Sequence, residues 1–203
     1  MKTEDFALIL IDIQKDFWRP YEAHPHFTSF PSNIRSLLTA ARERRITVIH
    51  TQAYFKQDRG DWMLFYRPQG RGNVPCIEGT EGAEFEKFSE PTANEHIVRK
   101  QTFDGFVDTN LAHILKEKEI KVALIGGLET SVCVLFTATS AYLKRIVPIV
   151  ISDACADEPR RHESTLEMYD RLSFMTTTTA RVLNDWEKVM KEAEPFIFHG
   201  KRP

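Results

Sequence analysis

Cys133 stands where the sequence pattern favours a reactive thiol. It follows the glycine pair Gly126-Gly127 and a short polar turn, at the expected start of a helix. Free backbone N–H groups and the helix dipole favour an anion at such a position. The sequence therefore predicts a thiolate with a lowered pKa, which is a good nucleophile at neutral pH. A buried structural cysteine is the alternative, because a thiol also packs as a small hydrophobe.

Asp12 and Lys100 each stand at the end of an expected strand. Asp12 closes the run 8–11, where a carboxylate is costly unless it is paired or used. Lys100 closes the run 97–99, and a lysine beside a cysteine and an aspartate would hold both as anions. Taken singly, Asp12 could pin a loop and Lys100 could be a solvated strand-end lysine. Together with Cys133 they supply the base, cation and nucleophile that acyl transfer needs.

The apolar runs and the helical spacings between them alternate along the chain. The expected strands cover residues 6–11, 46–50, 96–99, 122–125, 146–151 and 174–176, and helices are expected after an N-cap at Ser32 and near residues 111–115, 134–142, 161–171 and 180–192. This alternation predicts a Rossmann-like, three-layer α/β/α fold with a six-stranded parallel sheet. Sites in such sheets form at the carboxyl ends of the strands. That rule selects five residues at expected strand ends: Asp12, His50, Lys100, Gly127 and Asp153.

Residues 52–95 interrupt this rhythm with little periodicity. A structureless segment of this length is uncommon in a compact domain unless it is functional. Its aromatic side chains include Tyr54, Phe55, Trp62, Phe65 and Tyr66. We interpret it as a wall or lid of a pocket, which a neighbouring subunit could share. A surface excursion with its own local packing is the alternative.

Composition limits the classes of protein that fit. The chain has 203 residues, 42% of them hydrophobic, and a net charge of −2. This suits one domain over residues 1–203 and gives no basic footprint for nucleic acid or an anionic membrane. No apolar run approaches the roughly 18 residues of a membrane span, and residues 1–5 do not resemble a signal peptide. Three cysteines fit neither a disulfide framework nor a four-ligand zinc site, so we expect a cytoplasmic protein with free thiols.

Five segments, in order, resemble the isochorismatase-like superfamily of cysteine hydrolases. They are residues 10–17, 79–84, 100–111, 127–141 and 152–156, and the resemblance covers essentially the whole chain. It implies a catalytic triad of Asp12, Lys100 and Cys133. It also implies a cis peptide bond between Leu128 and Glu129, with an oxyanion hole formed by the backbone N–H groups of Glu129 and Cys133.

The activity implied is metal-independent hydrolysis of a C–N bond in a small amide or ureido (carbamoyl) compound, through a Cys133 thioester with release of ammonia. The metal-binding nicotinamidase branch uses an Asp-x-His pair after the second strand, whereas this chain has residues 51–55 without ligands there. We therefore expect no metal and no cofactor, and we interpret His24 and His26 as surface residues. Vinyl-ether hydrolysis of the isochorismatase type and a non-catalytic scaffold are the alternatives. No Gly-x-Gly-x-x-Gly follows the first strand, which argues against NAD.

Candidate substrate-binding side chains are Phe17, Trp18, Tyr54, Phe103, Phe106 and Glu129. Core packing is the alternative for each aromatic residue. The Glu129 side chain could face the pocket and prefer a cationic or hydrogen-donating substrate, or it could hydrogen-bond its own turn. Arg19 and the loop residues Arg59, Arg67 and Arg71 could bind a substrate carboxylate or could be solvated. Family members usually form dimers or tetramers, so a homo-oligomer is expected. Cys155 fits a packing role, and Cys76 has no sequence-based interpretation.

Overall fold

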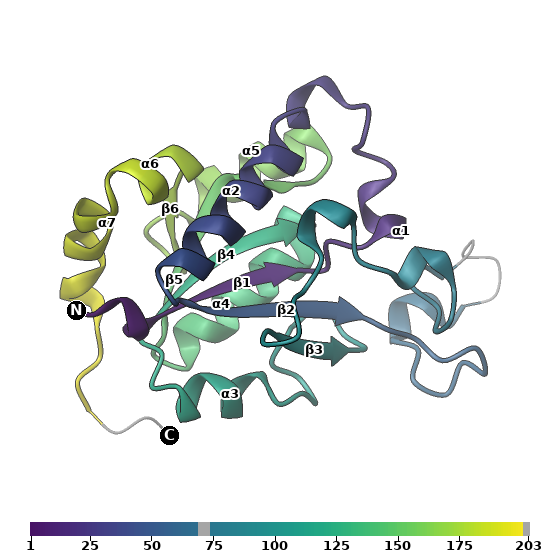
Figure 1. The fold of residues 1–203 in the computed structure, drawn as a ribbon. Helices are drawn as coiled ribbons and strands as arrows, with labels where there is room; N and C mark the ends of the chain where they lie inside the picture. The colour runs from purple at the N-terminus through teal and green to yellow at the C-terminus, as the bar shows by residue number, and fades with distance from the viewer. Residues whose placement is uncertain (69–73, 201–203) are drawn as a thin grey trace.

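A computed structural model of the chain describes residues 1–68 and 74–200 and contains a six-stranded parallel sheet of order β3-β2-β1-β4-β5-β6. The strands are β1 (Phe6–Ile11), β2 (Thr47–Ala53), β3 (His96–Lys100), β4 (Val122–Leu128), β5 (Val147–Ala156) and β6 (Met175–Thr177). Their arrows point the same way in Figure 1. The predicted parallel sheet is confirmed.

Helices cover both faces of this sheet. They are α1 (Lys15–Trp18), α2 (Phe30–Glu43), α3 (Leu111–Glu117), α4 (Leu135–Leu143), α5 (Pro159–Tyr169), α6 (Thr179–Asn184) and α7 (Trp186–Ala193). Short 3₁₀ helices occupy Thr3–Asp5, Pro25–Phe27, Leu64–Tyr66, Glu81–Ala83, Lys87–Ser89 and Glu194–Phe196, and a π-helical turn, η6, covers Thr130–Val134. Figure 1 places α2, α6 and α7 over one face and α3 and α4 over the other, which is the expected three-layer α/β/α arrangement.

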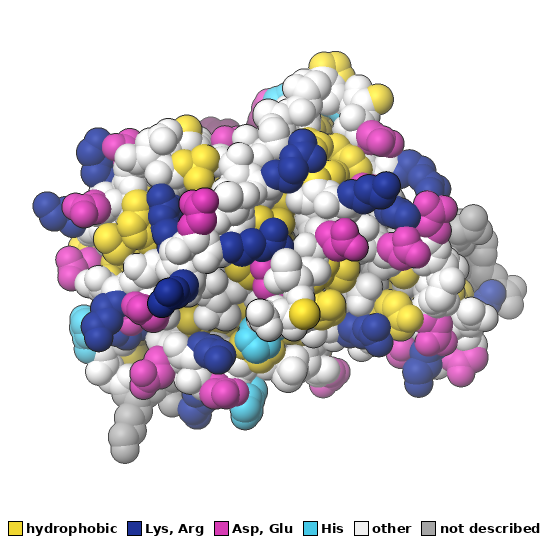
Figure 2. All heavy atoms as spheres, viewed as in Figure 1, with side chains coloured by type: hydrophobic (Ala, Val, Ile, Leu, Met, Phe, Trp, Pro, Cys, Tyr) yellow, Lys and Arg dark blue, Asp and Glu magenta, His cyan; other side chains and the backbone are white. Residues whose placement is uncertain are grey.

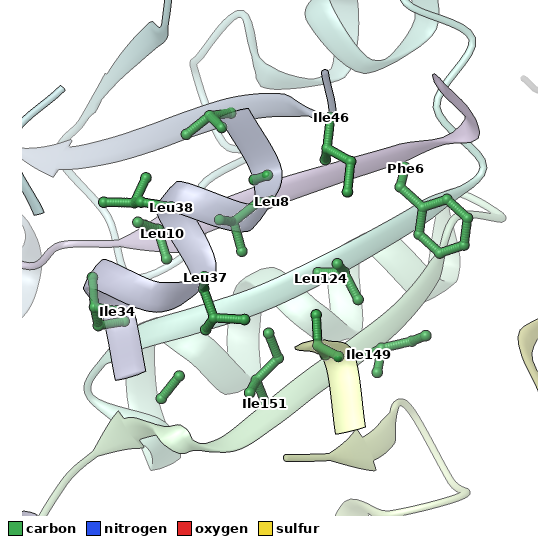
Figure 3. Packing of buried hydrophobic residues seen from close by; sticks show 14 of the residues in the cluster. Phe6, Leu8, Leu10, Ile34, Leu37, Leu38, Ile46, Leu124, Ile149 and Ile151 are labelled. Carbon is green, nitrogen blue, oxygen red and sulfur yellow. The ribbon is translucent and has the colours of Figure 1, made fainter. Parts of the chain in front are cut away.

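The core divides at the sheet because side chains alternate along a strand. In β1, Phe6, Leu8 and Leu10 enter one cluster, in which α2 contributes residues such as Ile34 and Leu37 (Figure 3). The intervening β1 residues Ala7, Ile9 and Ile11 enter the opposite cluster, against α3 and α4. A strand covered on both faces reads as a continuous apolar run, which is why β1 could be predicted at its observed bounds.

Two helix predictions need correction. The helix expected after Ser32 begins at Phe30, with Ser29 as its N-cap, and the Ser32 hydroxyl donates back to the Ser29 carbonyl oxygen. Pro31 fits the first turn because its missing N–H would have no partner there. The expected helix 180–192 is two helices separated at Asp185, whose non-helical backbone ends α6 and precedes α7.

Three strands extend three or more residues beyond their predicted ends. β4 continues through the glycine pair to Leu128, and β2 and β5 run to Ala53 and Ala156. His50 and Asp153 therefore lie inside strands rather than at their ends. His50 Nε2 lies 3.0 Å from Glu95 Oε2, and Asp153 Oδ1 accepts hydrogen bonds from the backbone and hydroxyl of Thr179. Both residues tie neighbouring segments to the sheet.

At Gly127 a side chain would clash with the neighbouring strand β1. The φ of Gly127 is +132°, and an added Cβ would lie 2.1 Å from the Ile11 carbonyl oxygen. Gly127→Ala is therefore expected to reduce the free energy of unfolding by about 3 kcal/mol, measured by urea denaturation. Gly79→Ala is the matched control, because Gly79 also has a positive φ but nothing within 4 Å of the added atom. Its expected cost is about 1 kcal/mol; equal costs would contradict a steric role for Gly127.

The segment after β2 forms a third cluster of its own. Ala53, Phe55, Cys76 and Ala83 are buried there. Partly buried side chains surround them: Phe17, Tyr54, Trp62, Met63, Tyr66, Val74 and Ile77. Local packing thus accounts for most of the aromatic residues, and it gives Cys76 a place in the interior. Residues 69–73 of this segment lie outside the described part of the chain.

The surface in Figure 2 mixes charges of both signs. Dark blue basic and magenta acidic side chains are interspersed over this face. Among the described helices, none has the length and apolar character needed to cross a membrane.

Candidate active site

Asp12, Lys100 and Cys133 meet at the carboxyl edge of the sheet. Asp12 directly follows β1, Lys100 ends β3, and Cys133 lies in η6 after β4. Lys100 Nζ is 2.6 Å from Asp12 Oδ2 and 3.4 Å from Cys133 Sγ. The strand order places β2 between β1 and β3, so the long lysine side chain spans the width of a strand to reach Asp12. The structure thus brings together the three residues selected from the sequence.

The three groups are removed from solvent. Asp12 is 0% exposed, Lys100 is 1% and Cys133 is 7%. A buried charge requires compensation by another charge or by hydrogen bonds. Lys100 Nζ has the Asp12 carboxylate, the Cys133 sulfur and the Thr102 carbonyl oxygen, at 2.8 Å, as partners. Each donor position of the ammonium group therefore has a protein partner.

Burial sets the protonation of the thiol and opposes the sequence-based expectation. Burial raises the pKa of Cys133, the positive charge of Lys100 lowers it, and the Asp12 carboxylate raises it again, so the net direction is upward. The predicted lowering of this pKa is wrong, because desolvation outweighs both the lysine and the backbone dipoles. Burial would lower the pKa of Lys100, but the charge of Asp12 and the hydrogen bonds to Asp12 and to the Cys133 sulfur outweigh it and raise that pKa. The resting site therefore holds an ammonium group, a carboxylate and a neutral thiol.

Thr51 fixes the Asp12 carboxylate from β2. Its hydroxyl donates to Asp12 Oδ1 at 2.7 Å, and the Asp12 N–H points back to Thr51. With Oδ1 held by the hydroxyl and Oδ2 beside Lys100, the carboxylate has one orientation. Thr51 pairs with Ile11 in the β1–β2 register and directly follows the predicted second strand, residues 46–50. Its position at that strand end is the sequence signal by which Thr51 could have been selected.

Asp157, which directly follows β5, and His162 of α5 hold the turn that carries Cys133. The backbone N–H and hydroxyl of Ser131 both donate to Asp157 Oδ2, at 2.8 and 2.6 Å. Thr130 Oγ1 lies 2.8 Å from His162 Nδ1, and burial lowers the pKa of His162. Sequence spacing did not predict the contacts of Asp157 and His162 with this turn, because only the folded chain brings them together. The Leu128–Glu129 peptide bond before this turn is cis.

The half-buried Glu129 side chain is hydrogen-bonded to a distant tyrosine. The Tyr21 hydroxyl donates to Glu129 Oε1 at 2.8 Å. Burial raises the pKa of Glu129, the Tyr21 hydrogen bond lowers it, and the charge of Asp157 raises it again, with an upward net direction. Burial raises the pKa of Tyr66, from the segment after β2, and a thiolate at Cys133 would raise it further. Its hydroxyl therefore lies within electrostatic reach of Cys133.

Two of the aromatic residues predicted to bind the substrate are packed in the core. Trp18 is buried in the first cluster and stacks on Phe30, with ring centroids 4.7 Å apart. Phe106 is buried in the second cluster, and the Lys144 ammonium group lies over its ring at 5.5 Å. Both side chains thus have the packing role that was the alternative for each.

The other three aromatic candidates are only partly buried. Phe17 packs between the first and third clusters. The Arg99 guanidinium covers the Tyr54 ring at 4.2 Å. Phe103 stacks on Phe136, at 5.9 Å between centroids, and meets Phe65 edge-on. These placements leave ring surface of Phe17, Tyr54 and Phe103 outside the closed core.

The candidate cationic and metal-binding residues have other partners. The Arg59 guanidinium lies over the Trp62 ring and Arg67 donates to the Trp62 carbonyl oxygen; Arg71 lies outside the described residues. Arg19 is exposed. His24 Nδ1 accepts the backbone N–H of His26. Within residues 1–68 and 74–200, no group of three or more His, Cys, Asp or Glu side chains has the arrangement of a metal site.

Comparison with known proteins places this site in a family. Residues 6–181 match the isochorismatase domain. The chain belongs to the isochorismatase family of hydrolases. The match extends from the start of β1 into α6, so it includes every element that contributes to the Asp12, Lys100 and Cys133 cluster.

Individual relatives of this isochorismatase-family chain are distant. A streptothricin hydrolase from Streptomyces noursei is 30% identical over 135 residues, which are 66% of this chain and 44% of that protein. Maleamate amidohydrolase from Pseudomonas putida is 25% identical over 79% of this chain and 76% of that protein. A cysteine hydrolase structure from Pseudomonas syringae has a TM-score of 0.82 at 23% identity, covering 93% of this chain and 95% of that one, which shows the shared fold. The chain spans about half the length of the streptothricin hydrolases it matches.

Proposed function

We propose that this chain is a metal-independent cysteine hydrolase that cleaves a C–N bond in a small amide or ureido (carbamoyl) compound and releases ammonia. The observation that carries the proposal is the buried contact of Lys100 Nζ with both Asp12 and Cys133. A carboxylate fixed beside a thiol supplies a general base and a nucleophile. Relatives named as a hydrolase and an amidohydrolase support the reaction class.

The acylation step follows from the resting protonation state. The neutral Cys133 thiol is hydrogen-bonded to the Asp12 carboxylate, which can take its proton. As the S–H proton moves to Asp12, the sulfur bonds to the substrate carbonyl carbon and the carbonyl oxygen becomes an oxyanion. The backbone N–H groups of Glu129 and Cys133 are the proposed donors to that oxygen, each contributing about 3–4 kcal/mol. Lys100 keeps its charge throughout and holds Asp12 next to the sulfur.

Three proton transfers by Asp12 complete the cycle. The protonated carboxyl group gives its proton to the substrate nitrogen, the C–N bond breaks, and ammonia leaves a thioester on Cys133. Water then adds to the thioester as Asp12 takes a proton from it. The C–S bond breaks, Asp12 returns the proton to sulfur, and the carboxylic (or carbamic) acid departs. One Asp12 side chain therefore serves as base and acid in acylation and as base and acid again in deacylation.

The contact between Lys100 and the Cys133 sulfur favours this chemistry over vinyl-ether hydrolysis. Cleaving a vinyl ether needs an acid to protonate the enol-ether carbon, and a cysteine nucleophile has no task in that reaction. A scaffold without turnover would have no need for a cation held at 3.4 Å from a buried sulfur. Metal independence rests on Thr51, Gln52 and Ala53, which end β2 without an imidazole or carboxylate.

The experiment is ammonia release from a panel of small primary amides, N-carbamoyl amino acids and ureido acids, with and without a chelator. Acid-quenched samples are analysed by intact-protein mass spectrometry for an acyl group on Cys133. Ammonia from one class together with the matching acyl mass supports the proposal. Turnover of a vinyl ether without an acyl adduct, or ammonia release that is abolished by the chelator and restored by a divalent metal, would contradict it.

A further inference from the structure

The Glu129 side chain has no task in the proposed chemistry, although its backbone flanks the nucleophile. Glu129 joins β4 to η6, and its carbonyl oxygen accepts the N–H groups of Val132 and Val134. The turn uses only the main chain of Glu129. Its side chain is therefore not required to form the turn. A glutamate here places a carboxylate beside the turn that holds Cys133.

Tyr21 orients this carboxylate instead of neutralising it. The hydroxyl binds Oε1 at 2.8 Å, and among residues 1–68 and 74–200 no second hydrogen-bond donor reaches the carboxylate. Tyr21 is itself buried and packs edge-on against Phe27 at 5.8 Å, so the donor is rigidly held. An ionised carboxylate offers about four acceptor positions, and Tyr21 uses one of them. The Oε2 atom remains able to accept hydrogen bonds from a bound molecule.

The charged groups that act on Glu129 are two carboxylates and one cation. Asp12 and Asp157 both add negative charge in its surroundings, whereas the positive charge comes from Arg161 at the exposed start of α5. Lys100 is paired with Asp12 at 2.6 Å. The described loop arginines Arg59 and Arg67 are both engaged at Trp62. A substrate carboxylate next to the scissile bond would meet Glu129 rather than a cation.

We propose that Glu129, oriented by Tyr21, selects substrates that carry an ammonium, guanidinium or other N–H donor group close to the scissile amide, and rejects those that carry a carboxylate there. The inference rests on the proposed C–N hydrolysis and names its substrate class. The Glu129 carboxylate attracts a substrate cation and repels a substrate anion, at an effective dielectric constant well below that of bulk water. Charge selectivity of at least about tenfold between matched cationic and anionic substrates is therefore expected.

The first test uses three amides of similar shape: β-alaninamide (cationic), butyramide (neutral) and succinamate (anionic). For the wild type, kcat/KM should fall in that order. Glu129→Gln should reduce the ratio of cation to anion at least about tenfold, chiefly by lowering the value for the cation and raising that for the anion. Tyr21→Phe keeps the charge and loses only its anchor, so it should reduce the ratio less. Glu187→Gln, an exposed change in α7 with the same effect on net charge, should leave the ratio unchanged.

A second readout requires no turnover. Methanethiosulfonates bearing a trimethylammonium or a sulfonate group form a mixed disulfide with Cys133 and release methanesulfinate, and peptide mass spectrometry gives the rate at this residue. The cationic reagent should react faster with the wild type, and Glu129→Gln should remove most of the difference. Ammonia release without charge preference, or a preference that Glu129→Gln leaves intact in both assays, overturns this inference alone. A Glu129-dependent preference in labelling, without ammonia from any amide or ureide, overturns the proposed function and leaves the charge selection standing.

Discussion

Cys133→Ala is expected to lower amide turnover by at least about 10⁴-fold while the protein stays folded. The variant removes the sulfur that forms the proposed acyl intermediate, and water would have to attack the substrate directly. Lys100 and Asp12 remain paired at 2.6 Å, so no buried charge loses its counter-charge. Removing one buried sulfur should cost about 1 kcal/mol of unfolding free energy. Ammonia release and urea denaturation measure the two effects separately.

Cys155→Ala provides the matched control. Cys155 is buried like Cys133, in β5 beside β4, and burial raises its pKa to about 12. Its thiol donates to the Ile125 carbonyl oxygen rather than contacting Asp12 or Lys100. The control should lose similar stability and keep activity within about threefold. Wild-type turnover in Cys133→Ala, or an equal loss in Cys155→Ala, would remove Cys133 from the mechanism.

The sheet and the cluster of Asp12, Lys100 and Cys133 could be predicted because their signals lie in short stretches of sequence. Strands covered on two faces produce continuous apolar runs, and β1 was predicted at its observed bounds of residues 6–11 for that reason. Asp12 and Lys100 are charged residues at the ends of two predicted strands. Parallel strands bring their carboxyl ends to one edge. These facts alone place Asp12, Lys100 and Cys133 near one another without knowledge of any contact.

The supporting contacts could not be predicted because they join residues far apart in sequence. Tyr21 and Glu129 are separated by 108 positions, and Ser131 and Asp157 by 26. Neither pair shares a spacing that a helix or strand would impose. The direction of the Cys133 pKa was missed for a related reason. The position at a turn before α4 is visible in the sequence, but the desolvation that outweighs it depends on packing from three strands and the turn together.

Removing one member of the Lys100–Asp12 pair should greatly reduce the free energy of unfolding. Lys100→Met removes the cation but keeps the length of the apolar side chain, and it leaves a fully buried carboxylate with Thr51 as its hydrogen-bond partner. The expected loss in unfolding free energy at pH 7 is about 3–5 kcal/mol. Turnover should fall by at least about 10²-fold, because Asp12 loses the group that positions it beside the thiol.

The pH dependence distinguishes an ion pair from simple packing. The folded-state pKa of Lys100 is raised, so its contribution to stability is complete below the unfolded value of about 10.4 and is lost only as pH rises through the folded value. The wild type should therefore keep this contribution from pH 5 to 9. In Lys100→Met the uncompensated carboxylate favours proton uptake on folding, so the deficit relative to the wild type should shrink as the pH is lowered from 7 to 5.

Adding Asp12→Asn to Lys100→Met should restore stability. The double variant holds two neutral side chains, and the Thr51 hydroxyl can still donate to the carbonyl oxygen of Asn at position 12. We expect it to be more stable than Lys100→Met by about 2 kcal/mol at pH 7, because no charge remains buried without a partner. Urea denaturation of the wild type, Asp12→Asn, Lys100→Met and the double variant at pH 5, 7 and 9 completes the cycle. Additive losses that do not vary with pH would mean that Lys100 and Asp12 contribute through packing, and the charge coupling on which the acid–base role of Asp12 depends would be absent.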